Sequence, residues 1–224
     1  MNIPVSFFPA PGVKTFREND MACGLSQEQI DKAVAFHGHW CPGLALGIRA
    51  AEWALANMGS ALDEEIVTVT ETDMCAVDAI QALVGCTFGK GNLIHHDMGK
   101  IAFTFYRRSD GKSARLVVRA DYICGDKDPF QRDLQRRFRT GQELTKEEKA
   151  LHARMRKESC ERIMSLPIEE IFHIKPADAP VPHRARLMES LVCEDCGEVV
   201  MESRIRRLEE KYYCISCFKK HDDR

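Results

Sequence analysis

Two histidines and a cysteine stand at every second position in the stretch FHGHWCPG, as His37, His39 and Cys41. Side chains two residues apart diverge on an α-helix but share one face of an extended segment. Gly38 should end one helix, and Pro42 disfavours helical backbone geometry at Cys41. We therefore expect an extended joint on which the three side chains converge. Imidazole and thiolate groups at such a point favour a transition-metal site.

The thiol of Cys41 has a second chemical option. Cys41 would be the N-cap of a helix that begins at Pro42, where the helix dipole and the free amide groups stabilise a thiolate. That thiolate could act as a metal ligand or as a nucleophile. The residues leave a structural alternative open, in which a buried cysteine lies beside two histidines that hydrogen-bond to the backbone.

Further site residues are expected from the stretch ETDMCAVDAIQ. Cys75 and Asp78 are three residues apart at the start of a helix, hence on one face, directly after a strand. If the domain is an enzyme, Cys41 or a metal-bound water is the reactive group, and Asp78 or Lys90 assists proton transfer. The stretch GCTFGKGN does not have the spacing of a phosphate-binding P-loop, and it predicts a tight turn that presents Cys86 and Lys90.

Two cysteine pairs near the C-terminus form the most specific pattern. Cys193-x-x-Cys196 and Cys214-x-x-Cys217 are separated by seventeen residues. This spacing predicts a zinc site with four thiolate ligands. The site should be structural, because a unit of about forty residues with few core residues needs a metal ion to stabilise its fold. A redox dithiol is the alternative. The tail, residues 183–224, carries nine basic and nine acidic side chains, so a zinc ribbon here does not imply DNA binding.

The elements that position these residues follow from capping and periodicity. Ser26 and Gln29 form a capping box at the start of the first helix, and glycines mark the ends of all three helices. Alternating, β-branched stretches predict the strands. In order, we expect helices over 27–37 and 42–58, a strand over 65–72, a helix over 76–84, and strands over 92–96, 100–108 and 114–120.

The chain divides by composition into an arm, a core domain, a linker and a tail. We expect an irregular N-terminal arm over 1–24, an α+β core domain over 25–174 with a charged helical extension over 131–166, a proline-rich linker over 175–182, and a zinc-binding domain over 183–224. The extension has ten basic and six acidic residues between Arg132 and Arg162. Because the two signs are interspersed, we favour a solvated helix on the core or on a partner subunit over a nucleic-acid contact.

Overall charge and cysteine usage set the protein class. A net charge of −2 and a pI near 6.5 disfavour nucleic-acid binding through bulk charge. Neither a signal peptide nor an apolar span of membrane length is recognised, so a cytoplasmic protein without membrane contact is expected. In that compartment the ten cysteines are better explained as metal ligands, reactive thiols or small buried residues than as disulfides.

The stretches FHGHWCPGLALGIRAAEWAL and ETDMCAVDAIQALVGCTFGKGNL, with the cysteine tail, closely resemble the family of the formylmethanofuran dehydrogenase E subunit. The resemblance implies an α-β-α-β-β-β core with a mixed sheet, like the glyceraldehyde-3-phosphate dehydrogenase-like domain fold, and an intertwined homodimer. The order of elements predicted above is the same. The family's motif positions are matched here by His37, His39, Cys41, Cys75, Asp78, Cys86 and Lys90.

The family name does not establish an activity, because the molybdenum or tungsten chemistry of that complex resembles other subunits. Our first hypothesis is a metal-binding protein with zinc or another transition metal in the core and structural zinc in the tail, acting as an accessory or as a redox- or C1-related enzyme component. The alternative is a metal-sensing adaptor whose zinc ribbon binds a protein, such as a molybdoenzyme, with RNA or DNA disfavoured. Whether the chain is itself an enzyme stays open.

Overall fold

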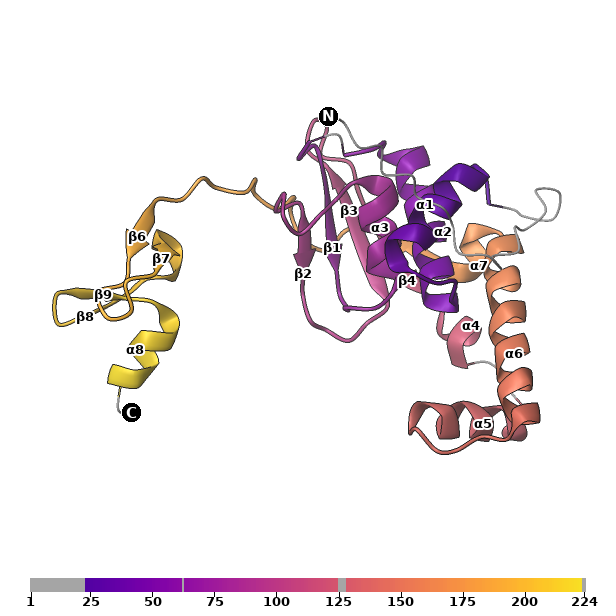
Figure 1. Ribbon diagram of the computed structural model, residues 1–224. Helices are drawn as coiled ribbons and strands as arrows, with labels where there is room; N and C mark the ends of the chain where they lie inside the picture. Colours follow the sequence, from indigo (N-terminus) through magenta and orange to yellow (C-terminus); the bar gives the residue numbers. More distant parts are fainter. Residues whose placement is uncertain (1–22, 62, 125–127, 223–224) are drawn as a thin grey trace, which may run out of the picture. The chain divides into compact units, whose positions relative to one another are not determined.

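The computed structural model describes residues 23–61, 63–124 and 128–222, so almost all of the arm expected over 1–24 lies outside the described residues. The chain forms two compact units, Met1–Arg184 and Ala185–Arg224. Figure 1 shows the elements of both. None of the helices in the described part of the chain has the length and apolar character needed to cross a membrane.

The first unit is built on a five-stranded mixed sheet. Its order is β2-β1-β3-β4-β5, and only the β1–β2 pair is parallel. The strands are β1 (Ile66–Thr70), β2 (Leu93–His95), β3 (Ala102–Arg107), β4 (Ser113–Val118) and β5 (Phe172–Lys175). The predicted α+β class with a mixed sheet is therefore confirmed. The fifth strand was not predicted, since its four residues follow directly on a short helix.

Three helices cover one face of this sheet (Figure 1). They are α1 (Gln27–His37), α2 (Pro42–Asn57) and α3 (Ala76–Val84), so the helices predicted over 27–37 and 76–84 are confirmed to the residue. The capping box of Ser26 and Gln29 is present, and Gly38 takes the left-handed conformation that ends α1. Helices α2 and α3 pack very closely at Gly47, which has no side chain. A Cβ atom added there would lie only 2.3 Å from the carbonyl oxygen of Ala76.

The charged extension forms two helices rather than one. After the short α4 (Ala120–Cys124) come α5 (Pro129–Arg139) and α6 (Lys146–Ser165), followed by α7 (Ile168–Ile171). The predicted capping box at Thr145 begins α6. The C-terminal end of α6 is fixed to α2, because the buried guanidinium of Arg49 donates to the carbonyls of Ile163, Met164 and Leu166.

The other sheet face carries a smaller apolar cluster. Val67, Val69 and Tyr106 are buried there, and Ala177 and Val181 pack against them. Part of the segment predicted as a linker over 175–182 is therefore attached to the sheet. The likeness to the glyceraldehyde-3-phosphate dehydrogenase-like fold stays a prediction.

The second unit consists of two hairpins and a terminal helix. Its elements are β6 (Ser190–Val192), β7 (Val199–Met201), the 3₁₀ turn η2 (Glu202–Arg204), β8 (Arg206–Leu208), β9 (Lys211–Tyr213) and α8 (Ile215–His221). Its buried core comprises Tyr213 and three cysteines, Cys193, Cys214 and Cys217. So small an apolar core needs another source of stability.

Candidate functional site

Three helix ends bring together a cluster of metal-ligand side chains in the first unit, which we call the core cluster. His37 is the last residue of α1, Cys41 caps the start of α2, and Cys75 precedes the first residue of α3. One ligand atom from each lies within 4.8 Å of the other two. Cys41 Sγ lies 3.6 Å from His37 Nε2. One imidazole nitrogen and two sulfur atoms are thus placed to share a single ion.

Backbone contacts hold the side chain of Cys41 at the start of α2. Cys41 is buried and extended, and its Sγ accepts the backbone N–H of Leu44 at 3.3 Å in the first turn of α2. Cys75 lies beside it. Burial, and then the neighbouring thiol of Cys41, raise the pKa of Cys75 above its ordinary value. A bound cation would offset the cost of placing two thiolates side by side, because its positive charge stabilises both.

Asp78 orients the imidazole of His37. Its Oδ2 lies 2.7 Å from His37 Nδ1. A carboxylate accepts a hydrogen bond, so Nδ1 carries the proton and the lone pair of Nε2 is directed toward Cys41. A carboxylate behind a ligating histidine is a common second-layer arrangement in zinc sites, where it fixes the ring and raises its basicity. Asp78 therefore supports the cluster without being part of it.

His39 does not join the core cluster, which corrects the predicted three-way convergence. His37 belongs to the last turn of α1, and Gly38 then reverses the chain with a φ of 90°. The alternation expected of an extended segment therefore applies only after Gly38. The exposed ring of His39 instead packs against that of His37, with centroids 4.4 Å apart.

Lys90 and Cys86 lie at the opposite end of α3 from the cluster. Lys90 Nζ donates to the carbonyl of Ala61 at 3.2 Å, and Cys86 Sγ donates to the carbonyl of Ile66 at 3.4 Å. Ala61 in turn pairs with Val84, the last residue of α3. A nine-residue helix is about 13 Å long. The structure therefore brings Asp78 to the core cluster but not Lys90, although both had been expected to assist proton transfer.

The four tail cysteines converge in the second unit. Ligand atoms of Cys193, Cys196, Cys214 and Cys217 all lie within 4.8 Å of one another. The sulfur atoms of Cys196 and Cys214 are 4.0 Å apart. This separation suits two thiolates bound to one tetrahedral zinc ion, with each Zn–S bond about 2.3 Å long.

Backbone amides stabilise the anionic form of two of these sulfur atoms, those of Cys193 and Cys214. The N–H of Cys214 donates to Cys193 Sγ at 3.2 Å, and the N–H of Cys217 donates to Cys214 Sγ at 3.4 Å. The backbone N–H groups of Cys196 and Cys214 lower the pKa of Cys193 to about 6. Because zinc binds thiolates rather than thiols, this donor set fits a zinc ion.

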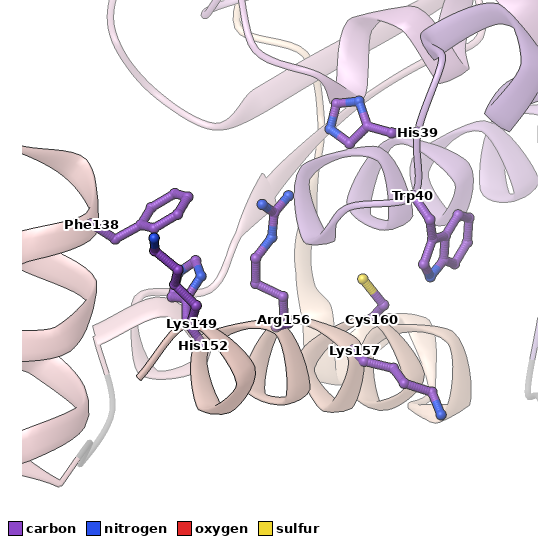
Figure 2. A pocket seen from close by; sticks show the side chains of 9 residues that line it. His39, Trp40, Phe138, Lys149, His152, Arg156, Lys157 and Cys160 are labelled. Carbon is purple, nitrogen blue, oxygen red and sulfur yellow. The ribbon is translucent and has the colours of Figure 1, made fainter. Parts of the chain in front are cut away.

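A groove of about 400 Å³ adjoins the core cluster, and we call it the α6 groove. It lies between α6, α5 and the loop that joins α1 to α2. Figure 2 shows Arg156 and Cys160 pointing from α6 toward the loop that holds His39 and Trp40. The sequence predicted a charged helix over this segment. It did not predict which side chains line the groove, because the helix has only a thin apolar stripe.

These two sites define the class of the protein, an α+β domain with a candidate metal-ligand cluster, joined to a four-cysteine zinc finger. Residues 36–173 match the family described as "FmdE, Molybdenum formylmethanofuran dehydrogenase operon". Residues 189–223 match "Prokaryotic dksA/traR C4-type zinc finger". The chain belongs to the FmdE family and carries zinc-finger residues at its C-terminal end, as the motifs predicted.

Two known proteins resemble the chain over most of its length. A protein of Archaeoglobus fulgidus described as "Probable S-adenosyl-L-methionine-binding protein" is 30% identical over 195 residues, which cover 82% of this chain and 53% of the relative. The chain thus spans about half the length of this relative. A protein from Syntrophus aciditrophicus, described as similar to FmdE of a tungsten formylmethanofuran dehydrogenase, has the same fold, with a TM-score of 0.55, 22% identity, and coverage of 88% and 93% of the two chains.

Proposed function

We propose that the core domain binds a transition-metal ion through His37, Cys41 and Cys75 and serves as a metal-dependent accessory protein in redox or C1 chemistry. The observation that carries the proposal is the convergence of one imidazole nitrogen and two sulfur atoms at three helix ends. The hydrogen bond from His37 to Asp78 supports it, because it directs Nε2 toward the two thiols.

Three protein ligands leave a coordination position for another molecule. Structural zinc sites fill all four positions with protein ligands, whereas catalytic sites keep one for water or substrate. When bound, the metal would act as a Lewis acid toward a ligand in that position. The protein would hold the proton of His37 on Nδ1 through Asp78, and the burial of Cys41 would limit access of water from the α2 side.

The metal content of the purified full-length protein tests this function. We expect two ions per chain for the wild type, one in the core and one in the zinc finger. Cys41→Ser should remove the core ion, since serine is a poor ligand for soft transition metals. Cys86→Ala is the matched control, because it removes a motif cysteine at the far end of α3 and should keep both ions. A Cys41→Ser protein that holds as much metal as the control would contradict the proposal.

For the zinc finger we propose a protein-binding role. Zinc is expected at its four cysteines, which match a known finger type. Its surface exposes apolar side chains, with Val192, Val199 and Met201 each more than half exposed. Such side chains favour contact with a protein, for which a second copy of the chain or a molybdoenzyme is our candidate. Binding to nucleic acid that weakens steeply with salt would instead support the adaptor with a nucleic-acid partner.

A further inference from the structure

The α6 groove has the size of a small-molecule site. Its volume of about 400 Å³ falls in the range of about 300 to 1,000 Å³ that is usual for ligand pockets. Two of its walls are helical, and the third is the loop between α1 and α2. Rigid elements therefore shape most of its surface (Figure 2).

The groove is lined by cationic side chains and by no carboxylate among the described residues. Lys149, Arg156 and Lys157 all contribute to it from α6. Lys157 lies 3.5 Å from Glu161 on the exposed side of the helix. Within the described part of the chain, neither Lys149 nor Arg156 has a carboxylate within ion-pair distance. Two uncompensated cations at one groove indicate an anionic ligand.

Aromatic rings line the groove beside these cations. Phe138 of α5 stacks on His152 of α6, with ring centroids 3.9 Å apart, and Trp40 lines the groove from the loop between α1 and α2. Flat apolar faces next to positive charges suit a ligand that combines a planar ring with a negative group. Arg156 is suited to phosphate, because a guanidinium can bind two phosphate oxygens at once.

The groove lies next to the core cluster, because the ring of His39, which lines it, packs against that of His37 with centroids 4.4 Å apart. His39 and Trp40 line it, and they are the residues between the cluster ligands His37 and Cys41. Cys160 of α6 forms part of the same wall.

We propose that the α6 groove binds a phosphate-bearing small molecule with a planar ring, its phosphate on Arg156 and Lys149 and its other end toward the core cluster. The position of that end beside a metal rests on the proposed function, whereas phosphate binding in the groove does not. The cationic lining disfavours S-adenosylmethionine, whose sulfonium and ammonium groups outweigh its single carboxylate.

Calorimetric titration of the full-length protein with adenosine 5′-monophosphate tests the proposal. We expect the nucleotide to bind more tightly than inorganic phosphate, adenosine or S-adenosylmethionine, and to bind more weakly as salt is raised. Arg156→Gln and Lys149→Gln should each weaken binding by about tenfold or more, because each removes a charged hydrogen-bond donor. Arg154→Gln is the matched control: Arg154 is exposed, lies outside the groove and pairs with Glu158. It should change the affinity by less than about twofold.

The outcomes separate this inference from the proposed function. Absence of nucleotide binding at millimolar concentration would overturn the inference, as would equal affinities for Arg156→Gln and Arg154→Gln. If the protein then still holds two metal ions, the proposed function stands alone. If the nucleotide binds through Arg156 but Cys41→Ser keeps both metal ions, nucleotide binding in the α6 groove is supported. The claim that the bound nucleotide lies beside a metal ion is then contradicted. Tighter binding of S-adenosylmethionine than of the nucleotide would contradict the charge argument.

Discussion

At the scale of single residues, the core cluster depends on a histidine whose ring is held by a carboxylate. Asp78 contacts His37 from the first turn of α3 and leaves Nε2 directed toward Cys41. A supporting carboxylate of this kind affects how tightly an ion is bound rather than how many ions are bound. Asp78 is thus a positioning residue.

Asp78→Asn should weaken core-metal affinity by about 10-fold to 100-fold while leaving the number of ions at saturation unchanged, because the amide no longer raises the basicity of the imidazole. Competition against a coloured chelator measures this. Asp73→Asn is the control, since Asp73 is exposed and lies just before the cluster residue Cys75. Equal metal affinities in the Asp78→Asn and Asp73→Asn variants would show that Asp78 does not support the metal site.

The sequence predicted these residue types better than their geometry. The ligand atoms of His37, Cys41 and Cys75 lie close together as expected, and Asp78 is adjacent to them. His39 was expected to join them by its alternation with His37, but the helix includes His37 and the turn at Gly38 changes the direction of the chain. The predicted helix end at His37 was correct, so the error was to apply the period of two across that end.

At the scale of elements, the site depends on the close approach of α2 and α3. The glycine at position 47 allows this approach, because a Cβ atom there would meet the Ala76 carbonyl oxygen at 2.3 Å and its Cα at 2.5 Å. Ala76 is the first residue of α3 and directly follows Cys75. The packing that stabilises the core therefore also sets the distance between the two cluster thiols.

Gly47→Ala should destabilise the core unit by about 3 kcal/mol or more, because backbone atoms of α3 must move to admit the methyl group. Urea unfolding of wild type and variant at equal metal content measures the difference. Gly89→Ala is the matched control, since a Cβ atom there meets nothing within 4 Å. A Gly47→Ala protein as stable as the control would contradict the close packing.

The contact of α5 with α6 should depend on pH through His152. Burial, and then the charge of Arg156, lower the pKa of His152 below its usual 6.5. The unfolded chain therefore binds this proton more readily, so stability from His152 is present above about pH 6.5 and is lost as the pH falls below it. Unfolding free energies of the wild type should decline more steeply between about pH 7 and 5 than those of His152→Phe. Parallel declines would show that His152 titrates normally.

Elements were predicted well where local signals mark both ends. The box of Ser26 and Gln29 with Gly38 defines α1, and Thr145 with Glu148 defines the start of α6. Strand β5 was missed because its four residues carry no turn signal before them, and their place is decided by pairing with β4. The groove wall could not be predicted for a similar reason, since it depends on the tertiary contact of α6 with α2.

At the scale of the whole molecule, the two units differ in what stabilises them. The first has an extensive apolar core, whereas the buried residues of the second are mainly the cysteines themselves. Loss of metal should therefore have unequal consequences. The sequence predicted this contrast, because four cysteines in a short charged tail leave few residues for a core.

The variant Cys214→Ser, Cys217→Ser should lose the zinc-finger ion and the fold of the second unit, since metal binding there provides the folding free energy. Hydrogen exchange of the full chain checks this residue by residue. We expect amides of β6 to β9 to lose protection while those of α2 and β3 keep theirs. Protected hairpins without zinc would mean that the tail folds by other means.

The central claim is that a metal ion binds to His37, Cys41 and Cys75. X-ray absorption at the metal edge of the variant Cys214→Ser, Cys217→Ser, in which only the core site remains, tests it most directly. We predict two sulfur neighbours at about 2.3 Å and an imidazole nitrogen at about 2.0 to 2.1 Å if the metal is zinc. A protein without bound metal, or a first shell that lacks sulfur, would contradict the claim.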